Sequence, residues 1–277
     1  MRHSIRILLS FFYSVGIDIS KLLVSFPGLF TYFRDLRKYK KILSVNSSNL
    51  VELPDSACRF GPLYPVVSDY YSSAGSASGH YFYQDLLVAN RIYRRKPDVH
   101  FDVGSRIDGF IAHLLSFDQQ TILGDVRPLE VNISNLSFVQ LDLTSEVLSC
   151  QFEKYQSISC LHVLEHMGLG RYGDSINPMG HYVALDNLSK LLSDSGTLYL
   201  SYPAGSVSRI EYNAHRVISF RESLEMFERF GLSIERLDYV NDCGALVSVK
   251  NLSEIDWETS FGLKCGCSIW ELSKSNC

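Results

Sequence analysis

The sequence predicts an α/β protein with a Rossmann-like sheet and helices on both faces, on the basis of three observations. Residues 99–109 read as a buried strand, a turn at Gly104 and the first turn of a helix. Two short apolar segments, 121–125 and 138–142, each end in an acidic residue. An amphipathic helix over 181–192 then precedes another strand. Strands that alternate with helices in this way favour a mainly parallel sheet.

The turn after the first strand indicates the kind of ligand. In a dinucleotide fingerprint the second glycine lets a pyrophosphate approach the backbone, but Arg106 occupies that position here. This substitution argues against NAD and FAD. The carboxylate of Asp102, two residues before Gly104, instead suits a ligand with a positive charge near the strand end, such as the α-amino group of S-adenosylmethionine.

These residues resemble the first motif of the class I S-adenosylmethionine-dependent methyltransferases, (D/E)-x-G-x-G-x-G after the first strand. Asp102 and Gly104 match the motif, whereas Arg106 and Asp108 replace the next two glycines. The segment 157–166 resembles the fourth strand of the family, which runs into the sequence Val-Leu-Glu-His at the mouth of the active site. Tyr-Gln stands before it where the family usually has Phe-Asp.

The later segments resemble the same family in the same order. Residues 197–203 match its fifth strand, 221–230 a helix, and 232–240 and 267–273 its last two strands. The resemblance extends over about 79–273 and implies the sheet order 3-2-1-4-5-7-6, with the last strand inserted antiparallel. The strings at 168–174 and 211–216 resemble an uncharacterised domain-of-unknown-function branch of the superfamily.

The resemblance implies S-adenosylmethionine as the cofactor and assigns the residues that bind it. Asp102 would contact the methionine amine, and Gly104 would allow the cofactor to approach closely. Asp125 would bind the ribose hydroxyls, and Asp142 would lie beside the adenine amino group. Arg106 is expected to reach over the glycine loop to the cofactor carboxylate, because arginine binds carboxylates in a bidentate manner.

The loops after the fourth and fifth strands carry the candidate catalytic residues. Methyl transfer to an alcohol needs a base near the acceptor, and Glu165, His166 and His215 are expected at the mouth of the site. His166 is the first choice as the base, and the alternative is that these histidines only hold the loops by hydrogen bonds. The other candidate bases are Asp174, His181 and Glu211.

No metal site is predicted. Nitrogen and oxygen ligands are available at Glu165, His166, Asp174 and His181, but no H-x-x-x-H spacing occurs on one helix face. The pair Cys265-Gly-Cys267 has no second pair to complete a zinc site.

The sequence indicates three regions: a basic and aromatic helical extension over 1–43, a linker or lid over 44–78, and a methyltransferase-like domain over 79–277. Aromatic residues and leucines alternate with basic residues over 26–43. This pattern is compatible with contact to an anionic membrane surface, and the alternative is a helix packed on protein. Interruptions by polar residues leave no apolar run long enough to span a bilayer.

The composition excludes some classes of protein. The chain has 277 residues, 46% of them hydrophobic and 20% charged, with a net charge of −4. This balance gives no reason to expect a nucleic-acid partner. Seven scattered cysteines, without a convincing signal peptide, indicate reduced thiols and a cytoplasmic location, with membrane-peripheral attachment as a possibility.

The function that these observations favour is methyl transfer to an oxygen of a small polar or glycan-type acceptor. One alternative is a binding or scaffold protein that keeps the fold without transfer, because Arg106, Asp108 and Gln156 depart from the family pattern. A second alternative is a nucleotide-sugar oxidoreductase or epimerase. Arg106 and the absence of a Y-x-x-x-K pair after the fourth strand disfavour it.

Overall fold

The computed structural model of the chain describes residues 12–13, 15–46, 55–145 and 153–275. The chain divides into two compact units, Met1–Ser76 and Ala77–Cys277. The second unit contains the predicted sheet, and the first contains the helical extension.

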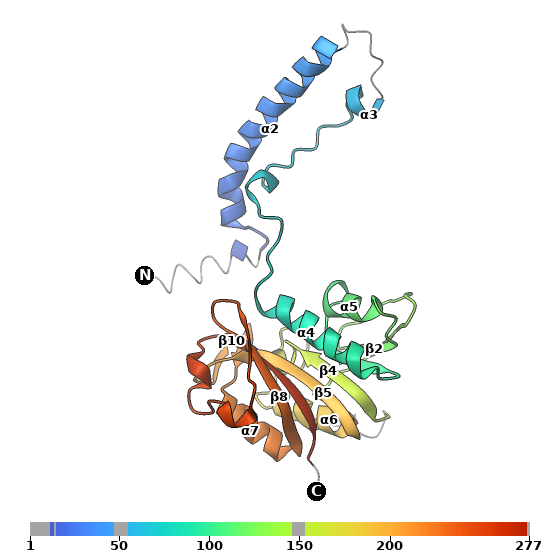
Figure 1. The fold of residues 1–277 in the computed structure, drawn as a ribbon, viewed down its shortest axis with the longest axis vertical. Coiled ribbons are helices and arrows are strands. Elements are labelled where there is room, and N and C mark those ends of the chain that lie inside the picture. The colour runs from blue at the N-terminus through green and yellow to red at the C-terminus, as the bar shows by residue number, and fades with distance from the viewer. Residues whose placement is uncertain (1–11, 14, 47–54, 146–152, 276–277) are drawn as a thin grey trace. The chain divides into compact units, whose positions relative to one another are not determined.

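The second unit is built around an eight-stranded sheet of order β3-β2-β1-β4-β5-β10-β8-β9 (Figure 1). The five strands from β3 to β5 are parallel, and β10 is antiparallel to both of its neighbours. The predicted order 3-2-1-4-5-7-6 is therefore confirmed, with β9 added as a short unpredicted strand at the edge. The strands are β1 (His100–Val103), β2 (Thr121–Asp125), β3 (Leu136–Gln140), β4 (Tyr155–Leu161), β5 (Leu192–Ala204), β8 (Leu232–Val240), β9 (Leu246–Ser248) and β10 (Gly266–Lys274).

Helices cover both faces of the sheet, as predicted (Figure 1). One hydrophobic cluster combines α4 (His80–Arg95) and α5 (Ala112–Leu115) with one face, and includes Val88, Ile92 and Leu114. The other combines α6 (Gly180–Leu191) and α7 (Phe220–Arg229) with the opposite face, and includes Leu185 and Phe227. Burial of apolar surface on both faces stabilises the parallel strands.

Two segments near the cavity differ from the predicted elements. The third strand ends at Gln140, so Asp142 lies beyond it rather than at its end. The helix predicted after Gly104 begins instead as a turn of π type over Ile107–Ile111, because Gly109 has non-helical dihedral angles (φ −123°, ψ −115°). A small hairpin of β6 (Arg209–Glu211) and β7 (His215–Val217) was also not predicted.

A buried group of charges joins α4 to the antiparallel part of the sheet. Arg91 pairs with Asp238 on β8 at 2.5 Å and with Glu271 on β10 at 3.5 Å. Arg95 also pairs with Glu271, whose side chain is only 2% exposed. Buried charges are stable only when they are paired in a fixed geometry, so this group sets the position of α4 on the sheet.

The first unit contains a long helix, α2 (Ile19–Asn46), and the shorter elements α3 (Asp55–Cys58) and η1 (Asp69–Tyr71). One side of α2 packs closely on a later segment, since a Cβ at Gly28 would lie 1.8 Å from the carbonyl oxygen of Val67. Tyr39 makes an edge contact with Phe60 on the same side. Of the helices in the described part of the chain, none is long and apolar enough to cross a membrane.

Replacement of Glu271 with alanine tests the charge group. Glu271→Ala removes one carboxylate from Arg91 and Arg95, and we expect the free energy of unfolding to fall by about 3 kcal/mol. The exposed pair of Asp186 and Lys190 provides a matched control, because Asp186→Ala should cost less than about 1 kcal/mol. Denaturant unfolding measures both changes, and equal losses would show that the buried group has no special role.

Candidate active site

A cavity of about 850 Å³ lies at the carboxyl ends of the parallel strands. Ligands of open α/β sheets bind at this edge. Most of the predicted site residues meet here, although they come from separate strands and loops. The predicted residues that line the cavity are Gly104, Arg106, Asp125, Asp142, Glu165, His166, Asp174 and His215.

The glycine loop follows β1 and forms the floor of the cavity on that side. Gly104 has a φ of +76°, and a Cβ there would lie 2.8 Å from both methyl groups of Val163. Glycine is therefore required at this position for both conformation and space. The loop turns over Asp102, whose carboxylate accepts hydrogen bonds from the Ser105 amide at 3.1 Å and hydroxyl at 2.9 Å.

The structure places Asp102 beneath the loop rather than in the cavity lining. Its side chain is fully buried, it also accepts a hydrogen bond from Ser159, and burial raises its pKa to about 7. Its observed role is to fasten the loop. Direct contact with the cofactor amine stays a prediction.

Arg106 lies at the cavity but pairs with its neighbour. Its guanidinium donates to the two carboxylate oxygens of Asp108 at 2.9 and 2.7 Å, and the two side chains are 79% and 70% exposed. The residues that replace two glycines of the family motif thus bind each other. The predicted contact of Arg106 with a cofactor carboxylate requires it to leave this exposed pair.

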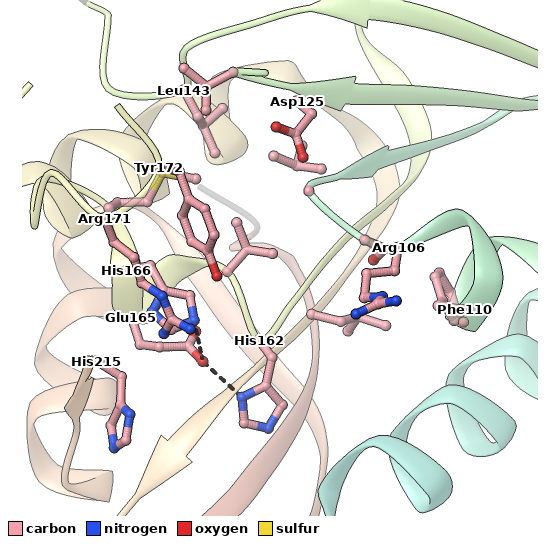
Figure 2. Close-up of a pocket in the computed structure, with 18 of the residues that line it drawn as sticks. Arg106, Phe110, Asp125, Leu143, His162, Glu165, His166, Arg171, Tyr172 and His215 are labelled. Carbon is pink, nitrogen blue, oxygen red and sulfur yellow. Dashed lines mark hydrogen bonds and ion pairs between the residues drawn. The ribbon is translucent and has the colours of Figure 1, made fainter. Parts of the chain in front are cut away.

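The acids at the end of β2 and just after β3 accept hydrogen bonds from their own loops. Asp125 accepts from the Arg127 amide at 2.8 Å and from its guanidinium at 3.0 and 2.8 Å. Asp142 accepts from the Thr144 amide at 2.8 Å and hydroxyl at 2.7 Å. Asp125 and Leu143, both labelled in Figure 2, line the cavity. An acid beside apolar side chains suits a ligand with a hydroxylated sugar and a flat base.

A cluster of titratable side chains follows β4. Figure 2 shows Glu165 between His162 and His166, with the Glu165 carboxylate 2.7 Å from His162 Nδ1 and 3.7 Å from His166 Nε2. All three side chains are almost fully buried. Among the described residues, no hydrogen-bond partner lies within bonding distance of His162 Nε2 or of His166 Nδ1.

The environment of the cluster sets the charge of its members. Burial lowers the pKa of His166, so the imidazole is neutral at physiological pH and able to accept a proton. Burial opposes ionisation of Glu165, but the neighbouring His162 lowers its pKa. The pKa of His80 is lowered to about 4. Burial is the larger cause, and the neighbouring His162 is the second.

Two buried or half-buried charges hold the loop that carries this cluster. The Arg216 guanidinium donates to the main-chain carbonyls of Met167 at 2.7 Å and Glu165 at 3.3 Å. The Asp174 carboxylate accepts from the amides of Gly168, Gly170 and Tyr172 at 2.8, 3.2 and 3.1 Å. The observed contacts of Asp174 are thus those of a residue that shapes the loop.

The two remaining histidines predicted as bases differ in their position relative to the cavity. His215, at the start of β7, is partly exposed at the cavity, with its Nε2 3.5 Å from Glu211. His181, on α6, lies 4.0 Å from Glu222 and does not line the cavity. The structure therefore brings Glu165, His166, Asp174 and His215 to one cavity and leaves His181 and Glu211 out of its lining.

The strand order decides the fold. Five parallel strands are followed by an antiparallel strand inserted before the last parallel one, and the helices lie on both faces. The chain has the class I methyltransferase fold. A dinucleotide-binding sheet has the parallel order 3-2-1-4-5-6, so the inserted β10 argues against the oxidoreductase alternative.

Comparisons with known proteins give one family match and several similar solved structures. Residues 115–232 match the family described as "Caenorhabditis protein of unknown function, DUF268", which confirms the resemblance to a branch of unknown function. A search of curated proteins finds no match.

Solved structures similar to the chain include a 1,6-didemethyltoxoflavin-N1-methyltransferase of Burkholderia thailandensis with bound S-adenosylhomocysteine. It is 13% identical, with 70% of this chain and 79% of that chain covered and a TM-score of 0.49. An O-methyltransferase from a multienzyme of Brevibacillus brevis, also in complex with S-adenosyl-L-homocysteine, is 14% identical, with coverage of 69% and 71% and a TM-score of 0.49.

The cavity residues that sequence reasoning missed include His80, Tyr81 and Asp85 of α4, and His162 after β4. The three on α4 have no local motif that marks them as site residues. His162 does have a weak signal, since His-x-x-Glu spacing places it within reach of Glu165. Its φ of +54° is uncommon for a residue other than glycine, and such strain is frequent at functional sites.

Proposed function

We propose that the protein transfers the methyl group of S-adenosylmethionine to an oxygen of a small polar or glycan-type acceptor. The observation that carries this proposal is that one cavity joins the strand ends that hold Gly104, Asp125 and Asp142 to the buried cluster of Glu165 and His166. A volume of about 850 Å³ lies within the range of ligand sites and allows two ligands side by side.

The proposed chemistry requires little from the protein. A lone pair of the acceptor oxygen attacks the methyl carbon, the bond from carbon to sulfur breaks, and S-adenosylhomocysteine leaves. The protein must align the two reactants at about 3 to 3.5 Å and exclude water. His166, neutral because it is buried, takes the proton of the hydroxyl, and Glu165 positions it.

Titration of the purified protein with S-adenosylhomocysteine tests the cofactor site. We expect the protein to bind S-adenosylhomocysteine but not NAD, and Asp125→Ala to weaken binding about tenfold or more, because a charged hydrogen-bond partner contributes about 1.5 to 3 kcal/mol. Glu130→Ala is the matched control, since Glu130 is an exposed carboxylate on the same loop outside the cavity lining. Equal affinities of the two variants would contradict the assignment.

Turnover with methyl-labelled S-adenosylmethionine and a panel of polyols, sugars and free glycans tests the base. Lowering the pH protonates an imidazole and stops it accepting a proton, and the pKa of His166 lies below its ordinary value of 6.5. Activity should therefore persist below pH 6.5 before it falls.

His166→Ala should lower turnover about 100-fold or more at unchanged affinity for S-adenosylhomocysteine. His215→Ala is assayed separately, and His113→Ala, outside the cavity lining, is the control. Full turnover in both cavity variants would leave positioning alone as the mechanism. Cofactor binding without transfer to any acceptor would favour the scaffold alternative.

We also propose that α2 lies on an anionic membrane surface. Leu22, Phe26 and Phe30 are 53%, 71% and 75% exposed, and their spacing of four residues places them on one side of the helix. The exposed Arg37 and Lys41 continue that side toward its C-terminal end. Apolar side chains followed by cations match the acyl boundary and the negative headgroups of a bilayer.

Co-sedimentation with vesicles tests this contact. The protein should bind phosphatidylserine-containing vesicles more tightly than phosphatidylcholine vesicles. Arg37→Glu with Lys41→Glu should weaken binding at least tenfold, because each basic residue contributes about 1 kcal/mol. Arg59→Glu, an exposed cation in the same unit that pairs with Asp55, is the control. Equal binding to both vesicle types, or self-association without vesicles, would contradict the proposal.

A further inference from the structure

Three potential metal ligands meet beside the cavity, although they are far apart in the sequence. His80 begins α4, His162 follows β4, and Cys267 lies near the start of β10. Each offers one ligand atom, and these atoms all lie within 4.8 Å of one another. We propose that His80, His162 and Cys267 bind one Zn²⁺ ion.

The separation of the ligand atoms fits a zinc ion after small side-chain movements. Bonds of about 2.0 to 2.1 Å to nitrogen and 2.3 Å to sulfur in a tetrahedron place the ligand atoms about 3.4 to 3.6 Å apart. The observed separations exceed this by little more than 1 Å at most. His80, which is only partly buried at the start of its helix, can supply this movement by rotation of its ring.

The surroundings of His162 point independently to a ligand. Its side chain is 5% exposed, its Nδ1 lies 2.7 Å from the Glu165 carboxylate, and its Nε2 has no hydrogen-bond partner. An unpartnered buried nitrogen is costly. Metal-bound histidines characteristically direct their second nitrogen to a carboxylate, which fixes the ring orientation. Glu165 occupies that position here.

The donor set favours zinc over magnesium or calcium. One thiolate and two imidazoles suit a borderline-soft cation, whereas magnesium and calcium prefer oxygen ligands. Cys267 is fully buried, which a metal ligand tolerates but a cysteine that attacks a soluble substrate does not.

Three protein ligands leave a fourth zinc position open, as in catalytic zinc sites. His80 and His162 line the cavity, so this position faces the space expected for the acceptor. The next step rests on the proposed function. The acceptor oxygen would bind at the open position, and the zinc ion would lower the pKa of the acceptor hydroxyl. Zinc binding itself does not depend on methyl transfer.

The experiment measures metal binding by the full-length protein without cofactor or acceptor. Protein stripped with a chelator is titrated with Zn²⁺ in competition with a chromophoric chelator, and metal content after dialysis is measured by mass spectrometry. We expect one Zn²⁺ per chain. Substitution with Co²⁺ should give a thiolate-to-metal charge-transfer band together with the visible bands of a tetrahedral ion.

The variants assign the ligands. His80→Ala and Cys267→Ser should each weaken zinc binding at least 100-fold, and Cys267→Ser should remove the charge-transfer band of the Co²⁺ protein. Glu165→Gln should weaken binding about 10-fold to 100-fold while the band remains. Cys265→Ser is the matched control, because Cys265 lies two residues from Cys267 and also lines the cavity but is outside the ligand group.

Circular dichroism establishes that each variant is folded, and His80→Ala carries the test should Cys267→Ser unfold. The proposal is overturned by three results: binding below one ion per chain, unchanged zinc affinity in folded His80→Ala, or a loss in Cys265→Ser equal to that in Cys267→Ser. Zinc binding without transfer activity would leave the site standing and contradict only the proposed function. Transfer activity in protein that binds no zinc would contradict the zinc site and leave the proposed function standing.

Discussion

The ion group beneath α4 is the interaction on which the site depends most. Arg91 and Arg95 are paired with Asp238 and Glu271, and both carboxylates are almost completely buried. Their desolvation is costly unless each charge meets its partner, so the helix can dock in only one way. The start of α4 lies over the carboxyl edge of the sheet, and His80 lines the cavity there.

The antiparallel insertion of β10 has an equally direct consequence for the chemistry. A parallel strand in this place would begin at the opposite edge, far from the cavity. Because β10 runs antiparallel to β5, its first residues pair with the last of β5, and Cys267 lies opposite Pro203. The antiparallel direction of β10, which distinguishes this sheet from a dinucleotide-binding one, therefore brings a thiol to the carboxyl edge of the parallel strands, next to His162.

The cavity also shows how a polar site is kept stable inside an apolar core. Glu165 and His166 are buried, which opposes any charge they carry. Arg216 and Asp174 compensate by binding main-chain groups of the same loop, and so fix the geometry of the cluster. Glu165 and His166 lie on a short 3-10 helix, Leu164–His166, and these contacts hold that helix and the loop after it over the sheet.

The sequence by itself determined the main strands and the glycine turn, because these depend on local signals, and the resemblance to a known family implied the order of the strands. Apolar runs, acidic residues near the ends of these runs, and a glycine after the first run can each be recognised in the local sequence. The structure gives Gly104 a positive φ. Tertiary structure alone decided which polar groups meet. Asp102 turned beneath its loop, Arg106 paired with Asp108, and His80, His162 and Cys267 converged from three separate segments. Pairings between distant side chains follow from how helices and strands dock, and no local pattern encodes that docking.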